Sequence, residues 1–516
     1  MDSFEKRFIK KERGNSGPRL CNGPFDLSMS EERICSLQGI CGGCVHIGTT
    51  YEEQLAQKNE DVRAQLTAAA SAPFDYEGIL RSPLIYAYRN KMEYSFGDEQ
   101  KNGPLTLGLH KKRSFYDVVD ADCCQLVHED FNVIVRATRK FFGELGLTYT
   151  DKRSHRGYLR HLLIRRAVHT GELLVDLVTT SQPLIPVMGH SFINDLSLYE
   201  TCGTELVPEV AGQGGMLESA GQQRAENFNE NTEGQTARNL QAQALATKKR
   251  RRGGRMTFPA LPAGSVRAAQ GVQVYPEKET LDAWRDLLLE LAAQGNISGK
   301  LCGILHTIND SPSDAIKNDR TDVLCGSDFI NETLLGLSFK ITPFSFFQTN
   351  SGGAEVLYEK ARSYVSGALH KSDTVYDLYS GTGTIAQMLA PCVKNVIGVE
   401  IIPEAVEAAR QNAARNGLSN CSFLAGDVLK VLDEIQEKPD VIILDPPRDG
   451  VNPKALTKIL AYGVETIVYV SCKCQSLCRD LAALEQAGYR LMKAAAVDQF
   501  PHTAHCEVVS IFQRND

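Results

Sequence analysis

The residues from Ser338 to Asp516 predict an α/β domain with a doubly wound, mainly parallel sheet. Short apolar, β-rich runs such as TVYDLY, NVIGVE, DVIILD and TIVYVS alternate there with helix-like stretches such as PEAVEAARQNAARNGL. Strands that alternate with helices form parallel sheets, because each crossover helix returns the chain to the same end of the sheet. Ligands bind at the carboxyl ends of such strands, so the residues that follow each strand are the candidate site.

The composition is that of a globular protein. The 516 residues are 42% hydrophobic and 23% charged, which excludes wholesale disorder, a collagen-like repeat and a coiled coil. The sequence opens MDSFEKRFIKKERG and has no run of about 18 or more apolar residues, so we expect a cytoplasmic protein without a membrane span. In that compartment the fifteen cysteines are expected to be metal ligands, nucleophiles or buried residues rather than disulfide partners.

Positive charge is concentrated in one region, although the formal net charge is −7. Residues 85–170 hold fifteen Lys and Arg against ten Asp and Glu, net +5, whereas residues 340–516 hold seventeen against twenty, net −3. Within the basic region, residues 152–166 combine six Lys and Arg with His and Tyr, and residues 110–116 read HKKRSFY. Basic residues interleaved with aromatic ones suit phosphate contacts and base stacking, with a solvated strand face as the alternative.

Shifts in composition predict three domains. A tail with a cysteine-rich segment covers residues 1–71, an α+β domain covers residues 72–337, and the α/β domain covers residues 338–516. The stretch at about 204–270 is polar and poor in aliphatic residues, so it cannot bury enough surface to offset the entropy of ordering. We expect this stretch to be a disordered insertion within the central domain.

Acidic residues that follow the predicted strands indicate the cofactor. The segment DLYSGTG, which contains Gly381, follows the first strand, and Glu400 ends the second strand about twenty residues later. Asp427 follows the third strand, where it suits contact with an adenine, and Asp445 ends the fourth. A carboxylate after each of strands two, three and four is typical of Rossmann-like class I methyltransferases that use S-adenosyl-L-methionine. Dehydrogenases carry a fuller G-x-G-x-x-G loop.

A cysteine and a glutamate near the C-terminus indicate the reaction. Cys472 ends the fifth strand in VYVSCKC, and Glu507 precedes the last strand in FPHTAHCEVVS. The C5 of uracil or cytosine is a poor nucleophile, so a thiolate adds to C6, C5 attacks the sulfonium methyl, and a base removes the C5 proton. Cys472 is the candidate nucleophile and Glu507 the candidate base. Cys474 and Cys478 are local competitors for the nucleophile's role.

Three cysteines near the N-terminus suggest a metal centre. Cys35, Cys41 and Cys44 are spaced C-x5-C-x2-C, and Cys124 follows far downstream. Closely spaced thiolates suit zinc or an iron–sulfur cluster, and the spacing does not choose between them.

Taken together, these motifs resemble the RNA uracil-C5 methyltransferase family from ICSLQGICGGC to FPHTAHCE, outside the insertion. The resemblance implies SAM-dependent methylation of uracil C5 in RNA by covalent catalysis. It further implies roles for seven residues: Cys472 as nucleophile, Glu507 as base, Gln348 of SFFQTN, Tyr379 and Gly381 at the cofactor, Glu400 as the ribose-side acid and Asp445 as the active-site acid.

The ribosomal branch of this family carries a [4Fe-4S] cluster, and resemblance to it implies a cluster on Cys35, Cys41, Cys44 and Cys124, with zinc as the less favoured metal. It also implies 23S ribosomal RNA as the substrate. Members usually read Ser-Cys-Asn-Pro at the nucleophile, whereas this chain reads Ser-Cys-Lys-Cys. We expect Lys473 to lower the pKa of the neighbouring thiol by its charge.

RNA capture is expected in the central domain, because members with an RNA-binding barrel carry it before the cysteines and only about thirty residues precede Cys35 here. The target base must be flipped out or unpaired to reach Cys472. Phe346 or Phe347 is a candidate to stack on it, with a core position as the alternative. A monomer is expected. The alternative functions are a tRNA uracil-C5 methyltransferase and a catalytically altered RNA-binding or ribosome-assembly factor.

Overall fold

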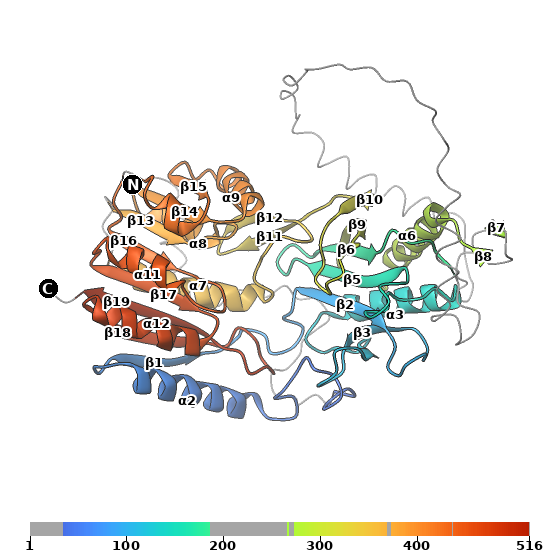
Figure 1. The fold of residues 1–516 in the computed structure, drawn as a ribbon, viewed down its shortest axis with the longest axis horizontal. Coiled ribbons are helices and arrows are strands. Elements are labelled where there is room, and N and C mark those ends of the chain that lie inside the picture. The colour runs from blue at the N-terminus through green and yellow to red at the C-terminus, as the bar shows by residue number, and fades with distance from the viewer. Residues whose placement is uncertain (1–34, 186–265, 268–272, 369–372, 436, 515–516) are drawn as a thin grey trace, which may run out of the picture. The chain divides into compact units, whose positions relative to one another are not determined.

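The structure is a computed structural model that describes residues 35–185, 266–267, 273–368, 373–435 and 437–514. Two large sheets and the helices packed on them make up this part of the chain (Figure 1). The insertion predicted at about 204–270 lies outside the described residues, apart from the short strand β7 (Val266–Arg267), which pairs with β8 (Gln273–Val274).

The C-terminal residues form most of an eight-stranded sheet with the order β1-β18-β19-β17-β16-β13-β14-β15. The five strands from β13 to β17 run parallel, and β19 pairs antiparallel with both β17 and β18. The mainly parallel α/β sheet that the sequence predicts is therefore present. Its strands are β1 (Asp75–Leu80), β13 (Thr374–Leu378), β14 (Asn395–Glu400), β15 (Cys421–Ala425), β16 (Val441–Leu444), β17 (Thr466–Ser471), β18 (Tyr489–Val497) and β19 (Glu507–Arg514).

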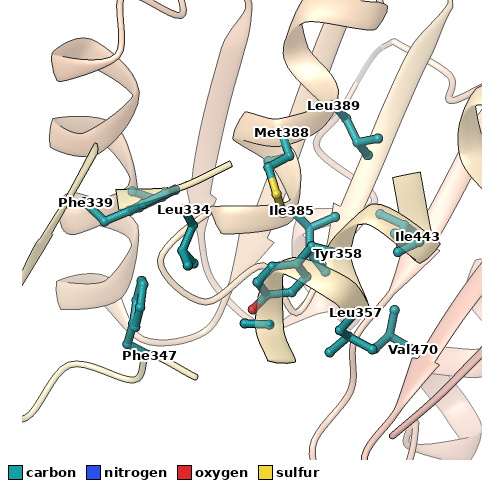
Figure 2. Close-up of a cluster of buried hydrophobic side chains, with 14 of the residues drawn as sticks. Leu334, Phe339, Phe347, Leu357, Tyr358, Ile385, Met388, Leu389, Ile443 and Val470 are labelled. Carbon is teal, nitrogen blue, oxygen red and sulfur yellow. The ribbon is translucent and has the colours of Figure 1, made fainter. Parts of the chain in front are cut away.

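Helices cover both faces of this sheet, because successive residues of a strand point to opposite sides. The helices are α2 (Tyr51–Ala69), α7 (Ser351–Ser366), α8 (Thr384–Leu389), η2 (Ala390–Cys392), α9 (Pro403–Arg415), α10 (Val428–Val431), α11 (Pro453–Leu460) and α12 (Cys474–Gln486). Val375 of β13 packs in the core with α7, α8 and α9, whereas the next residue, Tyr376, packs with α2, α10, α11 and α12. Figure 2 shows part of the first layer, where Leu357 lies beside Val470 and Ile385 lies near Tyr358.

The N-terminal strand β1 belongs to the C-terminal sheet, and the helix before it, α2, packs on that sheet's layer of helices (Figure 1). β1 pairs in parallel with β18, and α2 packs on α12. A capping box fixes the start of α2, since the side chains of Thr50 and Glu53 each accept from the other's backbone N–H. β1 falls within the range 72–337 predicted for the central domain, so that boundary does not coincide with the boundary between the sheets.

The central residues form a seven-stranded sheet with the order β10-β9-β6-β5-β2-β3-β4, antiparallel except between β6 and β9. Its core is centred on Trp284, whose Nε1–H donates to Thr138 Oγ1 (3.1 Å). The elements are β2 (Lys91–Gly97), β3 (Thr106–His110), β4 (Val118–Asp120), α3 (Glu129–Glu144), β5 (Leu159–Arg166), β6 (Glu172–Thr179), α6 (Glu277–Ala293), β9 (Lys300–Ile308) and β10 (Arg320–Gly326). A hairpin of β11 (Ile330–Leu334) and β12 (Leu337–Ile341) then leads towards α7. None of the helices described here is both long enough and apolar enough to cross a bilayer.

Candidate active site

A cavity of about 1600 Å³ opens at the carboxyl ends of β13, β14, β16 and β17, where the strand order reverses. Every residue that the sequence predicts to act in catalysis or cofactor binding lines this cavity. They are Gln348, Tyr379, Gly381, Glu400, Asp427, Asp445, Cys472 and Glu507. The fold therefore brings together residues that are far apart in the chain, and their individual roles stay predictions.

Glycine and Glu400 shape the loop after β13. Gly381 and Gly383 adopt left-handed backbone conformations (φ 54° and 73°), and a Cβ on Gly383 would lie 2.5 Å from the ring of Phe423. The Glu400 carboxylate accepts hydrogen bonds from the backbone N–H groups of Gly381 (3.0 Å) and Ile402 (2.9 Å). Each carboxylate oxygen has a further lone pair, so Glu400 can also accept from a ligand's hydroxyls.

Asp427 and Tyr379 line the same cavity. Asp427 is the N-cap of α10, and its Oδ1 accepts from the backbone N–H of Leu429 (2.9 Å). Tyr379 has a left-handed backbone (φ 67°), and its N–H donates to the carbonyl of Val399 (2.9 Å). Burial, followed by the charge of Asp427, raises the pKa of Tyr379 to about 12, so its hydroxyl stays neutral.

The SFFQTN segment contributes another wall, and its two phenylalanines differ in burial. Phe347 packs in the core beside Phe339, with ring centroids 5.9 Å apart (Figure 2), whereas Phe346 is 68% exposed. The backbone carbonyl of Gln348 accepts from Asn90 Nδ2 (2.9 Å), and its Oε1 accepts from Gln499 Nε2 (3.5 Å). Phe346 is the better placed of the two candidates to contact a base, and Phe347 takes the core position.

A buried arginine of the central sheet holds the start of this segment and the turn before it. Arg165 of β5 donates through Nε to the carbonyl of Pro343 (2.9 Å) and through Nη2 to the carbonyl of Ser345. Burial lowers the pKa of Arg165 to about 10, so the guanidinium remains charged at neutral pH. The position of this cavity wall therefore depends on a residue outside the C-terminal sheet.

Three carboxyl groups at or beside the cavity have raised pKa values, and Asp445 acts on the other two. Burial raises the pKa of Asp445 to about 7, and burial together with the charge of Asp445 raises the pKa of Glu507 to about 8. Asp377 accepts from the N–H of Ala386 (2.9 Å), but burial and then Asp445 raise its pKa to about 8. Carboxyl groups with pKa values near neutrality are suited to proton transfer.

Cys472 and Glu507 lie at the same end of a strand pair. β17 and β19 are antiparallel, with Ser471 opposite Val508. Cys472 is the residue after Ser471, and Glu507 is the residue before Val508. The proposed nucleophile and base therefore meet at the same rim of the cavity, as the strand order of the sequence predicts.

The environment of Cys472 favours the thiol over the thiolate. Burial, then the charges of Glu507 and Asp445, raise the pKa of Cys472 to about 11, and the charge of Arg448 opposes them. The prediction that Lys473 lowers this pKa is wrong, because the pKa rises and the cation that acts on the thiol is Arg448. Lys473 is instead the N-cap of α12, and its backbone N–H donates to Ser471 Oγ (3.3 Å).

The two cysteines that compete with Cys472 in the sequence lie elsewhere. Cys474 is buried and Cys478 half-buried on α12, with their Sγ atoms 3.9 Å apart. Neither lines the cavity, whereas Cys472 does. Their position favours Cys472 as the nucleophile.

Sequence reasoning assigned no role to three further residues that line the cavity: Arg448, Phe500 and His505. Arg448 Nη2 lies 3.3 Å from His505 Nδ1, and burial, followed by the charge of Arg448, lowers the pKa of His505. A signal was present in the sequence, because Arg448 directly follows Asp-Pro-Pro and His505 lies two residues before Glu507.

The cysteines predicted to hold a metal come from two segments that meet. Burial, then the nearby thiols of Cys124, Cys41 and Cys35, raise the pKa of Cys44 to about 12. All four are free cysteines. Within the described residues, no group of three or more His, Cys, Asp or Glu side chains is arranged to hold a metal ion. The iron–sulfur cluster therefore stays a proposal.

Comparison with known proteins agrees with this geometry. The family model for tRNA (uracil-5-)-methyltransferase matches residues 315–515. An uncharacterized RNA methyltransferase of Clostridium tetani is 38% identical over 510 residues, covering 99% of this chain and 90% of the relative. An uncharacterized RNA methyltransferase of Caldanaerobacter subterraneus subsp. tengcongensis is 38% identical over 492 residues, covering 95% of this chain and 86% of the relative.

Among solved structures, the tRNA (uracil-54, C5)-methyltransferase of Pyrococcus abyssi in complex with S-adenosyl-L-homocysteine has a similar fold, with a TM-score of 0.58 at 22% identity. The similarity covers 91% of this chain and 85% of that one. The family model and the near full-length relatives together carry the assignment. The chain belongs to the RNA uracil-C5 methyltransferase family.

Proposed function

We propose that this protein transfers a methyl group from S-adenosyl-L-methionine to C5 of a uridine in RNA. The observation that carries the proposal is that Cys472, directly after β17, and Glu507, at the start of the paired strand β19, both line the cavity that Asp445 also lines. The charge of Glu507 also acts on the thiol of Cys472, so the two side chains are near each other. This proximity suits a nucleophile and a base that act on the adjacent atoms C6 and C5 of one ring.

The reaction follows from the two side chains. The Cys472 thiolate adds to C6, so C5 becomes nucleophilic and takes the methyl group, and S-adenosyl-L-homocysteine leaves. The Glu507 carboxylate then removes the C5 proton, the C6–S bond breaks, and the thiolate is released. The raised pKa of Glu507, about 8, makes it a stronger base than an ordinary carboxylate. The charge of Arg448 favours the thiolate form of Cys472.

The methyl donor is proposed to lie along the loop after β13. Glu400 fixes this loop through two backbone N–H groups and has lone pairs left for ribose hydroxyls, and Asp427 suits the adenine. The remaining contacts proposed for the donor come from Gln348, Tyr379, Gly381 and Asp445. The target uridine, flipped out of its helix or already unpaired, then approaches from the side of Phe346.

The proposed substrate is 23S ribosomal RNA, on the basis of the cysteine segment. Cys35, Cys41, Cys44 and Cys124 would hold a [4Fe-4S] cluster, which would brace the fold, since methyl transfer from S-adenosyl-L-methionine consumes no electron. Two observations support a cluster: the thiols act on one another electrostatically, and the N–H of Gly43 donates to Cys41 Sγ (3.3 Å). Hydrogen bonds to sulfur are a feature of cluster sites.

Transfer RNA is the second candidate substrate. It is favoured by the tRNA (uracil-5-)-methyltransferase family model and by the tRNA (uracil-54, C5)-methyltransferase whose fold is similar. In vitro transcripts of 23S ribosomal RNA fragments and of tRNA, assayed side by side for 5-methyluridine, separate the two. Formation of 5-methyluridine only in tRNA would overturn the ribosomal proposal and leave the chemistry unchanged.

Covalent trapping tests the chemistry itself. RNA that contains 5-fluorouridine should form a denaturation-resistant adduct with the wild type in the presence of the methyl donor, because fluorine at C5 cannot be removed by a base. Cys472→Ala should form no adduct and no 5-methyluridine, whereas Cys478→Ala, the matched control outside the cavity, should retain both. Methylation by Cys472→Ala would refute the mechanism, and absence of an adduct in the wild type would favour a non-catalytic RNA-binding factor.

The metal proposal has its own measurement. Protein purified without oxygen should be brown and contain iron and acid-labile sulfide, and Cys41→Ser should lose both. Stoichiometric zinc in place of iron would overturn the iron–sulfur assignment.

A further inference from the structure

The connection between β3 and β4 exposes two neighbouring aromatic rings. Phe115 is 60% exposed and Tyr116 is 50% exposed, and the three basic residues KKR precede them in the chain. Clustered exposed apolar side chains mark interaction sites. Residues 111–117, together with Lys152 and Arg153, are called here the basic-aromatic tip.

Cations from a second segment hold both rings in place. Lys152 Nζ lies 4.3 Å from the centre of the Phe115 ring, and Arg153 Cζ lies 4.6 Å from the centre of the Tyr116 ring. Lys152 is itself anchored, because its ammonium donates to Asp314 Oδ2 (2.8 Å) and to the carbonyl of Phe115 (3.1 Å). Each ring is therefore supported by a cation on one side while much of its surface remains exposed, which preorganises it for a flat partner.

Positive charge without acidic partners lies beside these rings. Lys112 and Arg113 make no ion pair with any residue that the structure describes, and Lys111 approaches Glu99 only at 4.0 Å. Such charges remain available for the phosphates of a polyanion. Lys152 and Arg153, at the start of the second basic cluster of the sequence, thus meet the first cluster, residues 110–116, at one surface.

A second cavity, of about 290 Å³, opens beside Phe115. Its polar lining includes Gln182, Ser311 and the buried His161, and burial lowers the pKa of His161 to about 4, so the ring is neutral. A neutral imidazole offers one donor and one acceptor. The volume is at the lower end for small-ligand sites, roughly 300 Å³, and no lining residue is shared with the catalytic cavity.

We propose that the basic-aromatic tip and the cavity beside it bind an unpaired nucleotide of the RNA substrate other than the uridine that is methylated. The base of this nucleotide stacks on Phe115 and enters the cavity, and the adjoining phosphates lie against Lys112, Arg113 and Arg153. The inference rests on the proposed function in that the RNA bound is the methylation substrate. It adds a second point of attachment, distinct from the catalytic cavity.

RNA is the occupant that these features favour. Stacking on a flat ring combined with phosphate contacts is how proteins hold single-stranded RNA, and the chain belongs to a family of RNA methyltransferases. An acidic protein surface would satisfy the cations, but it offers no repeated planar group to cover two neighbouring rings and a polar cavity.

The experiment compares substitutions that separate stacking from apolar burial. Binding of a fluorescein-labelled, mixed-sequence single-stranded RNA is measured by anisotropy for the wild type, Phe115→Leu and Phe115→Trp. Loss of the stacking ring in Phe115→Leu should weaken binding about 5- to 150-fold, and Phe115→Trp should restore it. Val323→Ala, an exposed apolar residue on β10 of the same sheet, is the matched control and should bind as the wild type does.

Further readouts distinguish failure of the inference from failure of the proposed function. Lys112→Ala should reduce the slope of log affinity against log salt by about 0.7. Phe115→Leu should raise KM for RNA with kcat and S-adenosyl-L-homocysteine affinity unchanged. Unaltered RNA affinity and KM in Phe115→Leu would overturn the inference and point to a protein partner. A wild type that binds RNA through Phe115 but forms no 5-methyluridine would overturn the proposed function and leave the RNA site standing.

Discussion

The thiol of Cys472 should react slowly with an alkylating reagent, and removal of Glu507 should speed that reaction. Alkylation requires the thiolate, and a rise in the pKa of Cys472 from 9.0 to about 11 lowers the thiolate population at pH 8 about 100-fold. Burial is the largest cause, Glu507 the second and Asp445 the third. Glu507→Gln removes one charge and leaves the burial, so we expect a pKa between 9.0 and about 11 and a gain in rate below about 100-fold.

The pH dependence provides a sharper test than the rate alone. The pKa of Glu507 is about 8, so its carboxyl is mostly neutral below that pH and repels a thiolate only above it. The faster alkylation of Cys472 in Glu507→Gln should therefore be seen at about pH 9 and vanish at about pH 6.5. Alkylation by iodoacetamide is followed by mass spectrometry of the peptide that contains Cys472, with the exposed Cys392 as a check on the reagent.

A control within the same cavity completes this experiment. Asp427 lines the cavity, but its charge is not among those that act on Cys472, so Asp427→Asn should leave the alkylation profile unchanged. If Cys472 is alkylated no faster in Glu507→Gln than in the wild type at about pH 9, or if its alkylation rate rises by the same factor at every pH, the electrostatic coupling between Cys472 and Glu507 is refuted.

Three further results are expected. With unmodified uridine RNA and the methyl donor, Glu507→Gln should accumulate a covalent protein–RNA complex that resists denaturing electrophoresis, because the C5 proton cannot leave. Rapid turnover without such a complex would show that another residue is the base. Glu400→Ala should weaken S-adenosyl-L-homocysteine binding about 10- to 150-fold by calorimetry, while the exposed cavity residue Glu404→Ala should change it little. Lys58→Met should lower the free energy of unfolding, measured in urea, by about 3–5 kcal/mol, because it leaves Asp498 buried and unpaired. A loss below about 1 kcal/mol would show that the Lys58–Asp498 ion pair contributes no more than a surface ion pair does.

The sequence predicts well which residues lie at the catalytic cavity, because their positions depend on the local pattern of apolar strands and the residues that follow them. Glu400, Asp445 and Cys472 each end a short apolar run, and parallel strands bring their carboxyl ends to one edge whatever the lengths of the connections. The position of Glu507 has a different cause: it begins β19, which pairs antiparallel with the strand that precedes Cys472, so its start lies at the same edge. Glu400, Asp445 and Cys472 are therefore placed at one site by local pattern, and Glu507 joins them through one strand pairing.

Features that depend on distant pairing are the ones that the sequence does not reveal. The isolated strand β1 could join either sheet, and its pairing with β18, more than 400 residues later, leaves no local signal. The pKa of Cys472 likewise depends on burial among several strands, so the charge of its neighbour Lys473 is a poor guide to it. The separation of Phe346 from Phe347 is set by packing against Phe339, which a run of two aromatic residues cannot indicate.

The cavity also depends on elements that lie outside residues 338–516. Arg165 and Asn90 of the central part hold the backbone before and at Gln348, and Lys58 of α2 donates to Asp498 and to the carbonyl of Phe500. These contacts fix two of the segments that line the site. A nucleotide bound at the basic-aromatic tip contacts the sheet that contains β5, and β5 carries Arg165. The sheet proposed to capture RNA is therefore the one that positions a wall of the catalytic cavity.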